Sequence, residues 1–287
     1  MTTAARPTRR PARQRAGRVL VNATALAVFA VFAFPVYWMV NSSLLPQNQV
    51  RSPTPTWFPA PGTLSSYRRV LQDGAFLSAL RASLTITVLT VAVALLFAFL
   101  AALAVSRFRF RGRRSFVIAV LVIQMIPVEG LFISQYKMLE AWQLLNTVAG
   151  LTLVYVATVL PFTIWTLRGF VTGVPVELEE AARTDGCSRL GAFFRVTFPL
   201  LAPGLVATGV FGFIQAWNEF TLALVVMTRP ESQTLPVWLR TFTDVNRGTD
   251  WGGIMAGSTL LAVPVVVFFL LVQGRMVSGL VSGAVKG

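Results

Sequence analysis

Histidine is absent from this chain of 287 residues, and cysteine occurs once, at Cys187. Without histidine the chain cannot build a Ser-His-Asp triad or a histidine general base, and most zinc sites are excluded. A single cysteine forms no internal disulfide and no thiolate cluster for a metal ion. The phosphate-binding pattern G-x-x-x-x-G-K-[ST] is also missing from the sequence. We therefore expect no catalytic residue, no metal site and no cofactor in this chain.

Charged residues are scarce too, because they make up 13% of the sequence whereas 55% of it is hydrophobic. An average soluble domain has roughly 25% charged residues, so the composition predicts an integral membrane protein. The net charge of +14 would suggest nucleic-acid binding in a soluble protein. Here most basic residues lie in the short segments between apolar runs, which indicates membrane topology and no nucleic-acid partner.

Several hydrophobic windows are long enough to cross a membrane, which requires about 20 mostly apolar residues. They cover approximately residues 19–40, 82–105, 116–135, 148–167, 204–227 and 254–272. A cleaved secretory signal is the alternative for the first window, but its apolar run exceeds the usual length of about 7–15 residues. We predict an all-α, polytopic membrane protein with six transmembrane helices in residues 19–287, preceded by an Arg-rich tail at residues 1–18.

The distribution of lysine and arginine predicts the orientation. Seventeen of these residues lie in the N-terminal tail, after the second window, in residues 168–203 and in the C-terminal tail, and eight lie in the other segments. Because cytoplasmic segments carry the excess, both termini and residues 168–203 are predicted to be cytoplasmic. The segment 41–80, rich in proline and aromatic residues, is then a partly ordered external loop. It either caps the spans or contacts an external partner.

Between the fourth and fifth windows the chain is polar and yet too regular for a simple loop. Pro175 suits the first position of a helix, where its missing N–H costs nothing. The carboxylates of Glu177 and Glu180 fall in the first turns, where they complement the positive end of the helix dipole. The pattern predicts a short acidic helix whose small residues, Ala181 and Ala182, allow a partner surface to approach closely.

A turn and a second helix are predicted to follow. Gly186, after Asp185, suits the left-handed residue that ends a helix, and Ser188 can cap the next one. Pro199 and Pro203 are predicted to stop that second helix before the fifth span. We call this helix-turn-helix the elbow, residues 177–203. The alternative is an amphipathic hairpin lying on the inner leaflet, which the acidic first helix disfavours because anionic lipid would repel it.

The elbow resembles a known motif. Glu180-Ala181-Ala182, Gly186 four residues later and Val196-Thr197-Phe198-Pro199 after nine more residues resemble the EAA motif in the membrane subunits of binding-protein-dependent ABC importers. Val and Phe stand where Ile and Leu are usual. The stretches 217–220, 249–252 and 279–287 are similar to the carbohydrate-uptake branch of this family, near the second membrane subunit of the maltose permease. The resemblance covers residues 19–287.

The resemblance implies a permease subunit that carries a sugar through the cytoplasmic membrane of a bacterium by alternating access. It implies as partners a second, homologous permease subunit, two copies of a cytoplasmic subunit that binds ATP and Mg²⁺, an extracytoplasmic solute-binding protein and membrane lipid. In such permeases the helix that carries the EAA motif is the coupling helix, which sits in a cleft of an ATPase subunit. The implied coupling residues are Glu177, Glu180, Ala181, Ala182, Asp185, Gly186 and Pro199.

Acidic residues inside the predicted spans are candidates for the solute pathway. Glu129 lies thirteen residues into the third span and Glu219 fifteen residues into the fifth, which places both roughly 20–22 Å from the inner face. An ionisable group at that depth faces a cavity or a partner, and Pro127 and Gly130 predict a broken segment around Glu129. Glu129, Asn218 and Glu219 therefore either line the pathway and bind sugar hydroxyls, or hold helices and subunits together.

Other functions remain as alternatives. The nearest is a permease of the same architecture for another solute, such as a polyamine or a phosphonate, which the stretches at 217–220 and 279–287 disfavour. An ion-coupled carrier acting alone would show internal repeats and charge pairs within the membrane, and the sequence shows neither clearly. An intramembrane enzyme would need clusters of histidine, cysteine or aspartate that the spans lack.

Overall fold

The computed structural model describes residues 12–244 and 248–284, so most of the predicted Arg-rich tail lies outside the described residues. The long helices are α1 (Ala12–Ser43), α4 (Gly74–Arg107), α7 (Val148–Gly173), α10 (Phe198–Asn218) and α13 (Trp251–Ala284). The shorter elements are α2 (Gln47–Val50), α3 (Ser65–Gln72), α5 (Arg113–Gln124), η1 (Val128–Leu131), α6 (Phe132–Ala141), α8 (Val176–Thr184), α9 (Arg189–Ala192), η2 (Phe193–Thr197), α11 (Thr221–Val226), η3 (Pro230–Ser232), α12 (Leu235–Leu239), η4 (Arg240–Phe242), β1 (Thr243–Asp244) and β2 (Gly248–Thr249).

The predicted all-α, polytopic fold is confirmed. Five helices of the described residues are long and apolar enough to span a bilayer, and the α5–α6 pair, bent by 94°, makes a sixth if it is counted as one span. Several helices extend past the predicted windows, and α4 begins at Gly74 and not at Ala82. The Asp73 carboxylate explains this start, because it accepts a hydrogen bond from the Ala75 N–H at 3.0 Å and caps the helix.

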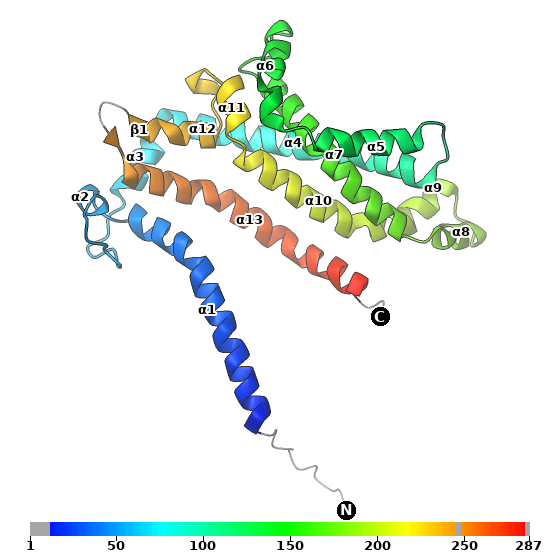
Figure 1. The fold of residues 1–287 in the computed structure, drawn as a ribbon, viewed down its shortest axis with the longest axis horizontal. Helices are drawn as coiled ribbons and strands as arrows, with labels where there is room; N and C mark the ends of the chain where they lie inside the picture. Colours follow the sequence, from blue (N-terminus) through cyan, green and yellow to red (C-terminus); the bar gives the residue numbers. More distant parts are fainter. Residues whose placement is uncertain (1–11, 245–247, 285–287) are drawn as a thin grey trace, which may run out of the picture.

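The third predicted span is broken close to where the sequence predicts a break. α5 ends at Gln124, and the chain bends by 94° before it continues through η1 into α6. Pro127 stands between the two parts in an extended conformation, and its missing N–H prevents a continuous helix there. α6 projects from the side of the bundle in Figure 1. The window 116–135 is therefore not one straight helix.

The fifth predicted span, residues 204–227, is wrong in its last part. α10 begins earlier, at Phe198, and ends at Asn218, after which the separate helix α11 follows. The Glu219 carboxylate explains the interruption, because it accepts hydrogen bonds from the N–H groups of Leu222 at 2.7 Å and Ala223 at 3.0 Å. Glu219 thus caps a new helix instead of lying in the middle of a long one.

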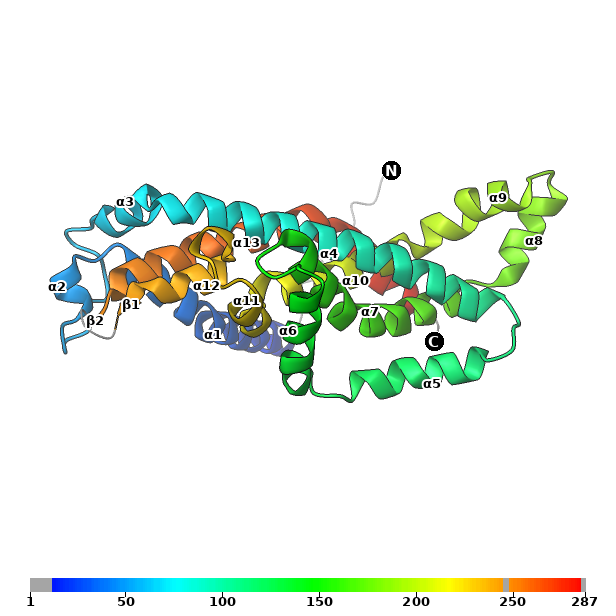
Figure 2. The ribbon, with the colours of Figure 1, turned by 90° about the horizontal axis from the view of Figure 1, so that it is seen from above.

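The centre of the bundle is formed by α4, α7 and α10, which pack side by side (Figures 1 and 2). On α4, Ala94, Ala98 and Ala102 are each at most 1% exposed. Where α10 meets α7, a Cβ on Gly204 would lie 2.4 Å from the ring of Phe170, so that glycine alone fits there. Small residues at the contacts let helix backbones approach closely, which is the usual way for helices to associate within lipid.

Helix α1 stands apart from this centre. It packs on α13 and diverges from the other helices (Figure 1). The apolar window of its span is 0% buried within this chain. Since α1 is hydrophobic around its circumference and has so few neighbours in its own chain, its surface must be covered by lipid or by another protein chain.

Several of the connections between the long helices lie at two opposite ends of the molecule, whereas α6 and α11 lie midway between these ends (Figure 2). Helices α2 and α3 and the β1–β2 pair lie at one end. The elbow helices α8 and α9 lie at the other, together with the connection between α4 and α5. In the sequence, the proline-rich segment 41–80 likewise lies between two arginine-rich segments, each separated from it by one apolar window.

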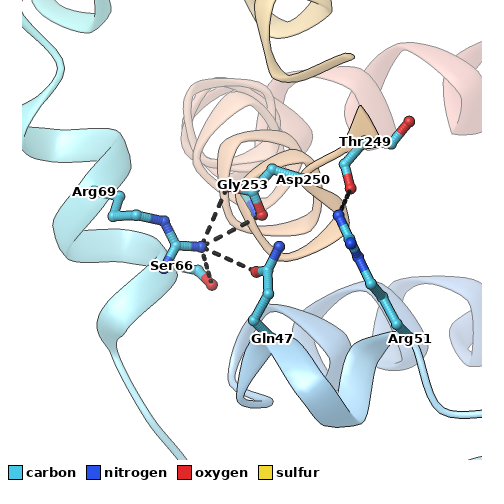
Figure 3. Close-up of polar contacts among 7 residues, drawn as sticks. All are labelled: Gln47, Arg51, Ser66, Arg69, Thr249, Asp250 and Gly253. Carbon is cyan, nitrogen blue, oxygen red and sulfur yellow. Dashed lines mark hydrogen bonds and ion pairs between the residues drawn. The ribbon is translucent and has the colours of Figure 1, made fainter. Parts of the chain in front are cut away.

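A polar network orders the end that carries α2 and α3 (Figure 3). The Arg69 guanidinium lies 3.3 Å from the Asp250 carboxylate and donates a hydrogen bond to the Gln47 amide oxygen at 3.3 Å. The Gly253 N–H donates to Asp250 at 2.9 Å, so that Asp250 caps the start of α13. Burial raises the pKa of Asp250, but the bonds from Gly253, Gln47 and Arg69 outweigh it and hold that pKa below its usual value. These contacts join α2 and α3 of the segment 41–80 to the start of α13.

Candidate functional site

The elbow begins with α8, which leaves the bundle at the end of α7. Pro175 is the residue before the first helical one, one position earlier than predicted, and Glu177 and Glu179 lie in the first turn. No residue of α8 is buried, and its apolar residues Val176 and Leu178 are 45% and 44% exposed. A helix this short gains little stability by itself. Its exposed apolar and acidic side chains are typical of a surface that a partner covers.

The turn after α8 requires its glycine. Gly186 has φ +93°, the predicted left-handed conformation. The Cys187 N–H donates to the Ala182 carbonyl at 3.0 Å, and the Gly186 N–H donates to the Arg183 carbonyl at 3.1 Å. These two bonds form a Schellman motif, which satisfies the last carbonyls of α8. A Cβ at residue 186 would meet no atom within 4 Å, so the backbone conformation, and not a lack of space, demands glycine.

The second helix of the elbow starts as predicted but continues further. The Ser188 hydroxyl accepts a hydrogen bond from the N–H three residues on, at 3.1 Å, and caps α9. α9 then passes through the π-helical turn η2 directly into α10, so the prediction that Pro199 and Pro203 end this helix is wrong. In η2 the Phe198 N–H donates to the Phe193 carbonyl. This wider turn shifts the hydrogen-bond pattern just before the proline, and the helix continues.

Side-chain contacts link the elbow to the helices behind it. The Thr197 hydroxyl donates to the Glu179 carboxylate at 3.2 Å and so joins the two arms of the elbow. Arg107, at the end of α4, donates to the Val174 carbonyl at 2.9 Å. A cavity of about 390 Å³ lies beside these contacts, and Arg107, Glu179 and Glu180 are among the residues that line it. These contacts connect α8 to η2, which leads into α10, and connect the residues just before α8 to the end of α4.

Most of the implied coupling residues lie together on α8 and its turn. Those with exposed side chains or backbone are Glu177, Glu180, Ala181, Asp185 and Gly186, and the half-buried one is Ala182. Pro199 is separate from them, exposed near the start of α10 at the base of the second arm. The sequence therefore located one contiguous acidic surface and one residue that belongs to the fifth span.

The three candidate pathway residues have different surroundings. Glu129 is exposed in η1. Asn218 is exposed at the end of α10, and its amide donates to the Ile214 carbonyl at 2.9 Å. Glu219 is half-buried, and its carboxylate accepts a hydrogen bond from the Tyr155 hydroxyl at 2.6 Å while it caps α11. The contacts of Glu219 hold α7, α10 and α11 together, whereas the exposed Glu129 side chain is accessible to a ligand.

A cavity of about 350 Å³ lies between the broken third span, α7 and α10, and no prediction anticipated it. Most of its lining is apolar, and it includes two aromatic rings and four polar side chains, those of Phe162, Phe211, Gln124, Gln135, Thr158 and Gln215. The amide oxygen of Gln135 is buried without a hydrogen-bond partner among the described residues. Amide groups both donate and accept hydrogen bonds, so this lining suits a ligand rich in hydroxyl groups. The glutamines on either side of Pro127 are the signal that could have predicted it.

These features define a class of protein: a polytopic helical membrane transporter subunit, with a broken span beside a cavity that contains several glutamines, and an exposed elbow at one end. Residues 94–280 match the family described as binding-protein-dependent transport system inner membrane component. The chain belongs to this family. The family that the sequence resembles is thereby confirmed, and so is a transport role in a multi-pass membrane protein.

Relatives in the family cover nearly the whole chain. It is 46% identical over 271 residues to the diacetylchitobiose uptake system permease protein of Streptomyces coelicolor, with 94% of this chain and 98% of that protein aligned. It is 37% identical over 254 residues to the trehalose transport system permease protein of Mycobacterium tuberculosis, with 88% and 92% aligned. Both relatives are named as permease proteins, one of a diacetylchitobiose uptake system and the other of a trehalose transport system.

A solved structure shares the fold. A chain of a bacterial ABC transporter involved in the import of the acidic polysaccharide alginate superposes with a TM-score of 0.77 at 24% identity, over 93% of this chain and 99% of that one. At this level of identity the likeness supports the architecture alone.

Proposed function

We propose that this chain is one of two membrane subunits of an ATP-driven importer, and that it carries a sugar of disaccharide or short oligosaccharide size into the cell. Relatives named for diacetylchitobiose and trehalose support the class of solute. The glutamine-lined cavity supports it chemically, because amides match the alternating donors and acceptors of a sugar. The rings of Phe162 and Phe211, with centroids 3.9 Å apart, offer an apolar wall for a sugar ring. Glu129 and Asn218 are further candidates along the path.

We propose that the other subunits are those that the resemblance implies. ATP and Mg²⁺ are bound by a separate cytoplasmic ATPase present in two copies, and a homologous membrane subunit completes the pathway. An extracytoplasmic binding protein delivers the sugar to the end that carries α2, α3 and the β1–β2 pair. The excess of arginine in residues 107–114 and 168–203 supports a cytoplasmic position for the opposite end and for both termini.

One observation carries the proposal: a tight turn at Gly186 joins the exposed α8 to a second helix that continues without a break into α10. A partner that grips α8 therefore holds one end of a membrane-spanning helix. ATP-driven closure of the ATPases favours one arrangement of the α8 helices, and the docked elbow transfers that preference to the membrane helices. The acidic, exposed surface at Glu177 and Glu180 is the proposed contact.

The test combines Glu180→Lys with Gly186→Arg. The first change reverses a charge on the proposed contact, and the second places a long side chain on the left-handed turn. We expect the double variant to insert normally in the membrane, to lose co-purification with the ATPase subunit and to lose sugar uptake. Glu231→Lys, a reversal of one exposed carboxylate in η3, is the control and is expected to keep the ATPase bound.

The outcomes separate the two parts of the proposal. Normal uptake by the double variant would contradict the coupling role of the elbow. If the double variant still bound the ATPase but lost uptake, the variant would impair a step other than attachment of the ATPase. Titration of the cognate binding protein with disaccharides and with polyamines tests the solute class independently, and selective binding of a polyamine would refute the sugar assignment.

A further inference from the structure

A second cavity at the elbow end of the molecule plays no part in the mechanism above. It encloses about 500 Å³ between the start of α5 and α7. Three arginines line it, Arg113 and Arg114 from α5 and Arg168 from α7, and Ser115 lies beside them. None of the described residues in its lining is acidic. Such a concentration of positive charge around a hollow attracts an anion.

The start of α5 favours an anion in the same place. Its N-cap is Gly112, with φ 87°, which has no side chain to accept a hydrogen bond from the first turn, and that turn contains no acidic residue. It contains Arg113 and Arg114 instead, whose charge is unfavourable at the positive end of a helix dipole. An anion at this position would accept hydrogen bonds from the uncapped N–H groups, and its negative charge would offset the repulsion between the arginines and the positive end of the helix dipole.

Arg168 provides an independent reason. Its Nε is buried and has no hydrogen-bond partner among the described residues, and its guanidinium carbon lies 5.2 Å from the centroid of the Trp165 ring. In the part of the chain that the structure describes, the one ion pair joins Arg69 to Asp250. None of the three cavity arginines is therefore neutralised by a carboxylate there. A buried N–H without a partner is unfavourable, and a phosphate in the cavity would offset the charge of this guanidinium.

We propose that this cavity binds a phosphate group, and that the group belongs to the headgroup of an anionic phospholipid in the cytoplasmic leaflet. The planar guanidinium matches two phosphate oxygens at once. The rim favours a lipid over a free phosphate ion, because Phe110 and Ile118 line the cavity and are 46% and 50% exposed. Acyl chains can follow the apolar surface of α5 from there. The assignment to this leaflet rests on the orientation proposed above.

Lipid binding to the full chain tests the site. Dihexanoyl phosphatidylglycerol is titrated onto the detergent-solubilised protein, and bound lipid is counted by native mass spectrometry. An arginine close to an anionic lipid changes the affinity about fivefold, so Arg113→Gln with Arg114→Gln is expected to weaken binding about 25-fold. Arg109→Gln with Arg111→Gln removes the same charge from the same connection without touching the cavity, and is expected to bind as the unchanged protein does.

Conservative variants and a competitor complete the design. Arg113→Lys with Arg114→Lys keeps the charge and is expected to retain most of the binding, which separates loss of the site from loss of the fold. Inorganic phosphate at the same concentration is expected to leave the lipid bound. Displacement by phosphate would assign the cavity to a free anion and overturn the lipid assignment.

Two further results would overturn the proposal. One is that Arg113→Gln with Arg114→Gln binds the lipid as tightly as the unchanged protein. The other is that Arg109→Gln with Arg111→Gln weakens lipid binding by the same factor, which would mean that the lipid is attracted by the overall positive charge and not by the cavity. Unchanged lipid binding with lost ATPase co-purification would assign these arginines to a protein contact. The elbow variant Glu180→Lys with Gly186→Arg is expected to keep its lipid affinity, so failure of the coupling proposal remains distinguishable from failure of this one.

Discussion

Replacing Gly186 with alanine isolates the conformational requirement of the elbow. The residue has φ +93°, and a Cβ there would meet no atom within 4 Å, so the substitution adds backbone strain without a clash. A residue with a Cβ costs about 1–2 kcal/mol in the left-handed region. The two hydrogen bonds of the Schellman motif should therefore be broken about 5–30 times more often in the variant.

Hydrogen exchange followed by mass spectrometry measures this opening in the full chain in detergent or nanodiscs. The amides of residues 186 and 187, which make these bonds, are expected to exchange about 5–30-fold faster in Gly186→Ala. Peptides from α7 and α10 should exchange at unchanged rates. If α8 is the surface that the ATPase grips, the affinity for the ATPase should fall by a similar factor.

Two matched variants make the result interpretable. Gly173→Ala is the same substitution at the end of α7, where φ is not positive and a Cβ would meet no atom within 4 Å, and it should leave exchange unchanged. Gly186→Asn should lie between glycine and alanine, because asparagine tolerates the left-handed conformation better than most residues. Equal exchange in Gly186→Ala and the unchanged protein, or equal acceleration by Gly173→Ala, would refute the argument from φ.

Three other predictions concern stability and the pathway. Gly204→Leu should lower the unfolding temperature in scanning fluorimetry, since overpacking against Phe170 costs about 1–3 kcal/mol, and Phe170→Ala should partly restore it. The pKa of Asp250 is lowered in the folded protein. Its contribution to stability is therefore fully present above the ordinary pKa of about 3.9, and it is lost as the pH falls through the lowered pKa. Asp250→Asn should remove this acid dependence from unfolding measured as the pH is lowered. Glu219→Gln should reduce thermal stability, whereas Glu129→Gln should change sugar uptake at unchanged stability. Reduced stability in Glu129→Gln together with unchanged stability in Glu219→Gln would contradict the contacts described for these residues.

The local structure of the elbow was predictable because each of its signals depends on neighbouring residues only. Gly186 and Ser188 adopt the left-handed turn and the helix cap that their residue types favour. Pro199 did not stop the helix, because a proline interrupts only a bond to the carbonyl four residues earlier, and the π turn before it had already changed that pattern. A π turn has no clear sequence signature, so this continuity required the structure.

Long-range contacts account for the other differences. Glu219 was correctly noted as unusual in an apolar stretch, but its role as a cap for α11 and as an acceptor for Tyr155 depends on the packing of α7 against α10. The glutamine-lined cavity likewise joins Gln124 and Gln135 to Gln215, residues that are distant in the sequence. Hydropathy distinguishes apolar from polar segments, and it does not indicate which polar side chains face each other.

The isolation of α1 affects how the protein is made. α1 is synthesised first, yet the helix it packs on in this chain is α13, which is synthesised last. At about 5–20 residues per second, the ribosome needs roughly 10–40 s to add the residues between them. During that time the contacts of α1 within this chain are those of its C-terminal end with residues 56–67, such as Asn41 with Thr56 and Trp38 with Trp57. Premature termination anywhere before Trp251 would leave α1 without the helix on which it packs.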